Sequence, residues 1–189
     1  MVAQISTISN AANDLKIDNV KAWSTEHPFL YDLKISVVRN GKIIDEVKSY
    51  FAMRKSSMQV DKNGVLRMML NNEFVFRIGP LDQGWWPDGL YTAPTDEALL
   101  FDIVKTKEMG FNLIRKHVKV EPARWYRYCD SVGMLVWQDM PSGDLGAHWN
   151  PRPGYEGGNE MNRSAASEKI YRTEWNAIME SLHNFPGIV

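Results

Sequence analysis

The chain has 189 residues, which is enough for one domain or two small ones. Its 22 basic and 23 acidic side chains leave a formal net charge of −1, so it lacks the positive surplus of proteins that bind nucleic acids or anionic membranes. With 44% hydrophobic and 24% charged residues, the disordered, collagen-like and disulfide-scaffold classes are excluded.

The first 70 residues have the alternating pattern of antiparallel strands. Asp32–Val37 alternates polar and apolar side chains, and Asn40-Gly41 then predicts a hairpin turn, because both residues tolerate a positive φ. A second strand is predicted from Ile43 to about Met53. Another turn, Asp61–Gly64, precedes a strand at Val65–Met68. We therefore predict an antiparallel β segment of the sandwich type.

Beyond residue 70, predicted strands and helices alternate. The strands are expected at Phe74–Gly79, Phe111–Arg115 and Met134–Asp139, with a fourth beginning at Gly187–Val189. The helices are expected from Thr95 to Gly110, from Pro122 to Gly133 and from about Ser167 to His183. Such βα units imply a parallel sheet covered by helices, either open or closed into a barrel. A closed barrel needs eight units, so this chain holds at most about half of one.

A long stretch rich in glycine and proline, Pro141 to about Asn162, separates the third strand from the last helix. We interpret it as a lid or as a long loop at the top of the barrel, and we expect it to be partly disordered. A metal site made of His148, Glu156 and Glu160 would match no known ligand spacing. Its glycines, at positions 154, 157 and 158, do not follow a strand and open a helix, which disfavours a phosphate loop.

Candidate functional residues are those that follow parallel strands, because the carboxyl ends of such strands meet at one edge. They are, in chain order, Asp82, Gln83, Trp85, Trp86, Asp88, Arg115, Lys116, His117, Lys119, Glu121, Gln138 and Asp139. This mixture of charged groups and indole rings suits a sugar, whose hydroxyl groups take paired hydrogen bonds and whose ring faces stack on tryptophan.

Other interpretations stay open for several of these residues. Arg115 and Asp139 could form a structural ion pair between neighbouring strand ends. At least one of Trp85 and Trp86 is expected to serve loop packing, and His117 could be hydrogen-bonded without any ligand. Glu121 precedes a helix, where a carboxylate is favoured for helix stability alone, so we reject it as a catalytic acid. Cys129, the only cysteine, is expected to be a small buried residue rather than a nucleophile or zinc ligand.

Five segments resemble, in the same order, segments of glycoside hydrolase family 2, the group of β-galactosidases, β-glucuronidases and β-mannosidases. They are His27–Leu33, Leu70–Gly79, Lys107–Arg115, Tyr128–Asp139 and His183–Val189. The resemblance implies a partial immunoglobulin-like β-sandwich over residues 1–70, followed by the N-terminal half of a TIM barrel over residues 71–189. It also implies part of a retaining, exo-acting β-glycosidase in carbohydrate degradation, closest in kind to a β-galactosidase.

The resemblance places both catalytic glutamates beyond Val189, the acid/base a few residues past it and the nucleophile much farther on. No catalytic residue is therefore expected within the chain, and the isolated chain is expected to be inactive. Arg115 matches the family's arginine on the second strand, and Asp139 matches the acidic position after the third. His117 stands two residues after that arginine, where the family often has a histidine three residues after it. Asp82, Trp85 and Trp86 occupy positions at which family members vary, which suggests that they set substrate choice.

The expected partner is a β-glycoside, without a metal, a cofactor, a nucleic acid or a membrane. Half a barrel would also expose a strand edge and apolar strand faces, so we expect self-association. A non-catalytic carbohydrate-binding or scaffold segment is the alternative function. Met1–Asn10 lacks the pattern of a signal peptide, which leaves the compartment of the protein open.

Overall fold

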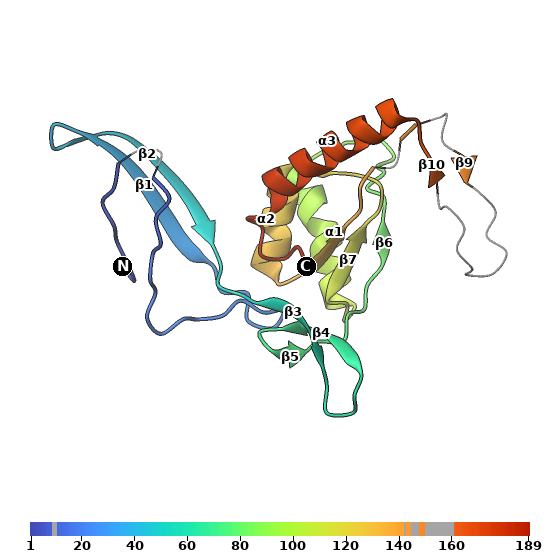
Figure 1. Cartoon of the computed structure of the whole chain (residues 1–189), viewed down its shortest axis with the longest axis horizontal. Helices are drawn as coiled ribbons and strands as arrows, with labels where there is room; N and C mark the ends of the chain where they lie inside the picture. Colours follow the sequence, from blue (N-terminus) through green and yellow to red (C-terminus); the bar gives the residue numbers. More distant parts are fainter. Residues whose placement is uncertain (9–10, 142, 145–147, 150–160) are drawn as a thin grey trace. The chain divides into compact units, whose positions relative to one another are not determined.

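The computed structural model describes residues 1–8, 11–141, 143–144, 148–149 and 161–189 (Figure 1). It divides into two compact units, Met1–Phe74 and Val75–Val189, which are described separately. The first contains antiparallel sheets, and the second contains parallel strands that alternate with helices. The assignment of residues 1–70 to an immunoglobulin-like domain and of residues 71–189 to a TIM barrel stays a prediction. No helix in the described part is long and apolar enough to cross a membrane.

The first unit holds two small antiparallel sheets. Strands β1 (Tyr31–Arg39) and β2 (Lys42–Phe51) form the predicted hairpin, and Asn40 and Gly41 have φ values of 50° and 72° at its turn. Strands β3 (Ser56–Val60), β4 (Leu66–Leu70) and β5 (Glu73–Phe74) form the second sheet.

Trp23 is the fully buried centre of the first unit. Its backbone N–H donates to the carbonyl of Met53 at 2.8 Å, and its carbonyl accepts from the side chain of Asn71 at 2.9 Å. These two hydrogen bonds tie the segment before β1 to the chain that follows β2 and β4.

The second unit is built on a parallel sheet in chain order. Strands β6 (Leu81–Asp82), β7 (Leu113–Lys116) and β8 (Leu135–Gln138) lie side by side, and Ile188 pairs in parallel with Val136. Helices α1 (Asp96–Glu108), α2 (Ala123–Val132) and α3 (Ala165–Leu182) follow the three strands in turn. A short antiparallel pair, β9 (His148–Trp149) and β10 (Met161–Asn162), lies between β8 and α3.

The strand expected over Phe74–Gly79 is wrong. The segment Phe74–Ile78 is apolar except for Arg77, but the side chain of Asn112 donates to the carbonyl of Phe76 at 2.8 Å and accepts from the N–H of Ile78 at 3.0 Å. A side-chain amide thus takes the place of strand pairing at the carbonyl of Phe76 and the N–H of Ile78. Backbone pairing begins at the carbonyl of Ile78, which accepts from the N–H groups of Asn112 and Leu113 at 3.1 and 3.2 Å. The first parallel strand is displaced to Leu81–Asp82.

The three helices are confirmed, with small shifts at their starts. The hydroxyl of Thr95 accepts from the N–H of Ala98 at 3.1 Å, as an N-cap does. Gly133 ends α2 with a φ of 78°. Pro122 is the N-cap of α2 rather than its first helical residue. The hydroxyl of Ser164 caps α3, so α3 starts at Ala165 and not at Ser167.

The core of the second unit lies between the helices and one face of the sheet. Its buried residues are Leu99, Ile103, Ile114, Trp125, Tyr126, Cys129, Met134, Val136 and Leu182. Cys129 is fully buried, and this burial raises the pKa of its thiol well above the usual value. Because side chains alternate along a strand, Ile114 and Lys116 face the helices.

The opposite face of the sheet carries Leu81, Arg115 and Trp137, which are register partners on β6, β7 and β8. We call these three residues the open sheet face. Leu81 is 53% exposed and Trp137 is 36% exposed, so apolar surface is left uncovered in the described structure. The half barrel and the self-association expected from it stay predictions.

Candidate functional site

A bidentate ion pair stands at the carboxyl edge of the parallel sheet. Arg115 comes from β7, and Asp139 directly follows β8. The Nε and Nη2 of Arg115 donate to Oδ1 and Oδ2 of Asp139, each at 3.0 Å. The carboxylate raises the pKa of the guanidinium, and the N–H of Asp139 donates to the carbonyl of Lys116 at 3.1 Å. The pair is fixed in geometry, yet 48% of the Arg115 side chain and 21% of the Asp139 side chain remain exposed.

Trp137 lies beside this pair on the open sheet face, since it is the register partner of Arg115. Sequence reasoning did not single it out, because it sits inside a nearly continuous apolar strand. The period of two provides the signal, since it places residues 137 and 139 on the same side. An indole next to a bidentate ion pair is a combination suited to a sugar ring.

Asp82 lies on the other side of the sheet from Arg115. It is the register partner of Lys116, and its Oδ2 is 2.5 Å from the Nζ of Lys116. That lysine is 1% exposed, and its Nζ also donates to Glu121 at 2.8 Å and lies 4.4 Å from the ring centre of Trp125. The structure therefore does not bring Asp82 together with Arg115 and Asp139.

Glu121 also holds a second buried lysine. The Nζ of Lys119 is 2.9 Å from Oε1 of Glu121 and donates to the carbonyl of Gly84 at 2.8 Å. Lys119 is 3% exposed, and its Nζ is 4.5 Å from the ring centre of Tyr91. These contacts join the loop after β6 to the loop after β7 (residues 117–122).

Tyr126 and Gln138 complete this buried polar network. The hydroxyl of Tyr126 donates to Oε1 of Gln138 at 2.6 Å and accepts from the N–H of Glu121 at 3.2 Å. Burial raises the pKa of this hydroxyl above its usual range. The amide of Gln138 donates to the carbonyl of Lys119 at 2.7 Å. The network thus fixes the loop after β7 from the side of the sheet that faces the helices.

His117 and the two tryptophans lie in the loops above β6 and β7. The side-chain amide of Gln83 donates to Nδ1 of His117 at 2.9 Å. Trp86 is half-buried, and its backbone pairs with Leu90 through hydrogen bonds of 2.7 and 2.9 Å. Trp85 is 63% exposed and lies edge-on to Tyr91. Trp85 is the more accessible of the two rings, while Trp86 is part of a tight turn.

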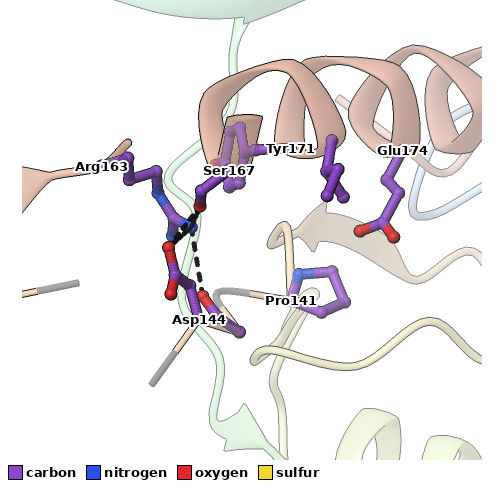
Figure 2. A pocket seen from close by; sticks show the side chains of 8 residues that line it. Pro141, Asp144, Arg163, Ser167, Tyr171 and Glu174 are labelled. Carbon is purple, nitrogen blue, oxygen red and sulfur yellow. Dashed lines mark hydrogen bonds and ion pairs between the residues drawn. The ribbon is translucent and has the colours of Figure 1, made fainter. Parts of the chain in front are cut away.

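A cavity of about 420 Å³ opens at the start of α3 (Figure 2). It is lined by Pro141, Gly143, Asp144, Arg163, Ser167, Ile170, Tyr171 and Glu174. The Nη1 of Arg163 donates to the carbonyl of Gly143 at 3.2 Å and to the hydroxyl of Ser167 at 3.3 Å. Sequence reasoning missed this cavity, because it depends on how Pro141, Gly143 and Asp144 lie against the first turns of α3.

No cluster of three potential metal ligands occurs within residues 1–8, 11–141, 143–144, 148–149 and 161–189. Glu156, Glu160 and the glycines at positions 154, 157 and 158 lie outside the described residues. The expected disorder over Pro141–Asn162 also falls mostly outside them.

Residues 2–54 match the family model of Glycosyl hydrolases family 2. A β-galactosidase of Lactococcus lactis subsp. lactis is 27% identical over 127 residues, which cover 67% of this chain and 12% of that protein. The β-galactosidase BgaC of Bifidobacterium adolescentis is 27% identical over 186 residues, which cover 95% of this chain and 17% of that protein. The chain belongs to glycoside hydrolase family 2. It spans 11–17% of the length of the curated family relatives that it matches.

Solved structures in this family share the fold. The crystal structure of the β-glucuronidase of Parabacteroides merdae matches with a TM-score of 0.71 over 93% of this chain and 20% of that chain. The sequence identity is 19%, so this match shows the fold alone. The antiparallel sheets and the parallel β-α-β unit of the chain therefore correspond to part of a family 2 structure.

Proposed function

We propose that the chain forms part of the substrate-binding rim of a retaining, exo-acting β-glycosidase that acts in carbohydrate degradation and resembles a β-galactosidase. The observation that carries the proposal is the bidentate pair of Arg115 and Asp139 at the carboxyl edge of the sheet. Ligands of barrel enzymes bind at this edge. The names of the Lactococcus and Bifidobacterium relatives support a β-galactoside as the substrate.

In this proposal the pair acts as a hydrogen-bonding clamp. Two adjacent sugar hydroxyls can donate to the carboxylate of Asp139 and accept from the outward N–H groups of Arg115, whose fork has five donors. Trp137 offers a partly exposed ring beside them, which suits the apolar face of the same sugar. In this proposal the pair orients a sugar and takes no part in breaking the glycosidic bond.

The candidate carboxylates Asp82, Glu121 and Asp139 are poorly suited to proton transfer, because each is already bonded to a cation. Asp139 is bonded to Arg115, while Asp82 and Glu121 are bonded to Lys116. A retaining glycosidase needs two carboxyl groups about 5–5.5 Å apart, one as the acid and one as the nucleophile. In our proposal the acid that protonates the leaving oxygen and the carboxylate that forms the glycosyl ester are therefore other residues.

A binding experiment on the 189-residue chain tests the proposal. Methyl β-D-galactopyranoside is titrated into ¹⁵N-labelled chain, and the amide shifts of residues 115–117 and 137–139 are followed. Arg115→Lys keeps the charge but loses the fork, so we expect affinity to fall by about ten-fold. Arg172→Lys is the matched control, because Arg172 is exposed on α3 and bonds Glu168 through a single nitrogen.

Two results would count against the proposal. One is binding that Arg115→Lys leaves unchanged, which would favour a carbohydrate-binding or scaffold role for another surface. The other is turnover of a chromogenic β-galactoside by this chain above a heat-inactivated control, since we assign it no acid and no nucleophile.

A further inference from the structure

The sequence contains two Asn-Gly pairs, and each lies in a turn between antiparallel strands. Asn40-Gly41 joins β1 to β2, and Asn63-Gly64 lies between β3 and β4. A basic residue precedes each pair, Arg39 in the first and Lys62 in the second. A Cβ placed on either glycine would meet nothing within 4 Å. The two pairs are therefore alike in local sequence and in access, and they differ in how the fold holds them.

An Asn-Gly pair can convert its own side chain. The backbone nitrogen of the glycine attacks the Cγ of the asparagine, so that an N–Cγ bond forms and the Cγ–Nδ2 bond breaks. The side-chain nitrogen leaves as ammonia and takes the proton of the glycine N–H. Water then adds to one of the two carbonyl carbons of the succinimide ring and returns a proton to the glycine nitrogen, which gives aspartate or isoaspartate. Glycine favours this intramolecular attack because it has no Cβ to block the approach.

Hydrogen bonding of the attacking nitrogen separates the two pairs. The N–H of Gly64 donates to the carbonyl of Asp61 at 3.0 Å. The N–H of Gly41 donates to no residue in the described part of the chain. The nitrogen of Gly64 must therefore give up a hydrogen bond before it can attack, whereas the nitrogen of Gly41 has none to give up.

The carboxylate of Asp61 restrains the second turn further. Its Oδ1 accepts from the N–H groups of Asn63 at 2.8 Å and Val65 at 3.0 Å, and its Oδ2 is 2.9 Å from the Nε of Arg67. The N–H of Asp61 also donates to the carbonyl of Val65 at 2.8 Å. The ring closes only when the backbone rotates to bring the glycine nitrogen to Cγ. These bonds oppose that rotation and so slow the reaction at Asn63.

The first turn lies at the weakly held end of a hairpin. Strands β1 and β2 form a sheet of two strands (Figure 1), and such a hairpin is by itself only marginally stable in water. A shift of register between Val37 and Val38 separates the last pairs before the turn from the rest of the ladder. Val38 and its partner Ile43 are 59% and 60% exposed. This end of the hairpin can therefore open easily, and opening frees Asn40 to rotate.

We propose that Asn40 is a site of spontaneous deamidation in the folded chain, and that its turn protects Asn63. One backbone hydrogen bond is worth about 1 kcal/mol net, so Asn40 should convert at least about five-fold faster than Asn63. The reaction needs only water. It involves neither a sugar nor the ion pair of Arg115 and Asp139, and it is independent of the proposed function.

The isoaspartate product changes the turn as well as its charge, because it adds one carbon to the main chain. Asn40 and Gly41 form a two-residue turn with φ values of 50° and 72°. The length and type of such a turn fix the register of the strands. Amides of the isolated isoaspartyl form should therefore exchange with solvent faster at Arg39 and Lys42 than those of Asn40→Asp, which has the same charge without the added carbon. Equal exchange would overturn this effect on the hairpin.

Mass spectrometry of the 189-residue chain follows both sites at once. The chain is kept in mildly alkaline buffer and cleaved at intervals by a protease that cuts after glutamate, which leaves Asn40 in residues 27–46 and Asn63 in residues 47–73. Fragmentation locates the gain in mass that accompanies conversion of the amide to an acid. Chain kept in urea is the control, because unfolding removes both turns. We expect the two sites to convert at similar rates in urea.

Asp61→Ala loosens the second turn and has a matched control. It releases the N–H groups of Asn63 and Val65, so Asn63 should convert about five-fold faster, the factor expected for one of these bonds. Asp45→Ala is the control, since Asp45 is exposed on β2 and its carboxylate accepts from the N–H of Glu46, outside both turns. It should leave the rate at Asn63 unchanged.

Four results would count against the proposal. Conversion of Asn63 as fast as that of Asn40 in the folded chain would mean that the second turn gives no protection. A preference for Asn40 that persists in urea would place its cause in the local sequence and not in the fold. If the chain in urea converts but the folded chain converts at neither site, the end of the hairpin does not open and the site is overturned. An unchanged rate at Asn63 in Asp61→Ala would overturn the protective role of that carboxylate.

Discussion

Replacing Lys116 by methionine tests the buried network behind the rim. Methionine keeps the length of the side chain but removes the charge that bonds Asp82 at 2.5 Å and Glu121 at 2.8 Å. Breaking a buried ion pair by removing one partner costs about 3–5 kcal/mol. The lower end applies here, because Glu121 keeps Lys119 at 2.9 Å and the Asp82 side chain is 26% exposed. We therefore expect Lys116→Met to lower the free energy of unfolding by about 3 kcal/mol.

Urea unfolding at pH 7, followed by ellipticity at 222 nm, measures this loss. The described helices all belong to the second unit, so this signal reports the unit that contains Lys116. Lys105→Met is the control, since Lys105 and Glu108 pair on the surface with about half of each side chain exposed. That change should cost under about 0.5 kcal/mol.

A second substitution separates lost charge from lost packing. Adding Asp82→Asn to Lys116→Met removes one orphaned carboxylate and should restore about 1 kcal/mol. If Lys116→Met costs less than about 1 kcal/mol, the lysine is not the centre of a buried ionic network and the reasoning is wrong. A loss that Asp82→Asn leaves unchanged would mean that packing, and not charge, dominates.

Four other predictions concern stability and association. Thr95→Ala should cost about 1 kcal/mol in urea unfolding through loss of the helix cap, and no change would contradict that role. Gly79→Ala should cost about 3 kcal/mol, because its Cβ would lie 1.6 Å from the carbonyl oxygen of Leu113, and an alanine variant of full stability would refute this geometry. The N–H of Val65 lowers the pKa of Asp61. The Asp61 carboxylate therefore stabilises the fold above its unfolded pKa of about 3.9, and this stabilisation is lost as the pH falls through the lowered pKa. Unfolding followed by tryptophan fluorescence should show a lower free energy of unfolding for Asp61→Asn than for the unchanged chain at pH 7, and a smaller difference at acid pH. The open sheet face should make sedimentation coefficients rise with concentration, whereas one monomeric species at all concentrations would contradict self-association.

Local signals predicted most of the secondary structure. The Asn40-Gly41 turn, the Thr95 cap and the Gly133 stop each depend on the conformational preference of one or two residues, and the structure confirms all three. The continuous apolar run Met134–Trp137 is likewise a strong signal for β8, because parallel strands covered by helices are apolar almost throughout. Patterns that a few neighbouring residues decide can be predicted from a single sequence.

The first parallel strand could not be located in the same way. The segment Phe74–Ile78 is a nearly continuous apolar run, as a strand often is, yet Phe74, Phe76 and Ile78 are 47%, 69% and 46% exposed. Asn112, more than thirty residues away, occupies the backbone groups that a neighbouring strand would need. A long-range contact therefore overrides the local pattern.

Only part of the candidate site could be predicted, for a similar reason. Proximity of Arg115 and Asp139 follows from the rule that parallel strand ends meet at one edge. Burial of Lys116 and Lys119 contradicts the usual exposure of lysine, so composition offers no warning. Only the alternation of β7, which places Lys116 on the same face as the core residue Ile114, hints at it. The role of the site residues in binding stays a prediction.

The position of Cys129 also makes its thiol a natural probe of local unfolding in the second unit. Its sulfur lies at 0% exposure between α2 and the sheet, and burial disfavours the thiolate that reacts with disulfide reagents. A reagent such as dithionitrobenzoate can therefore modify it only when the helical layer separates from the strands. Because it is the only cysteine in the sequence, the rate of that modification would measure how often this core opens, without any introduced label.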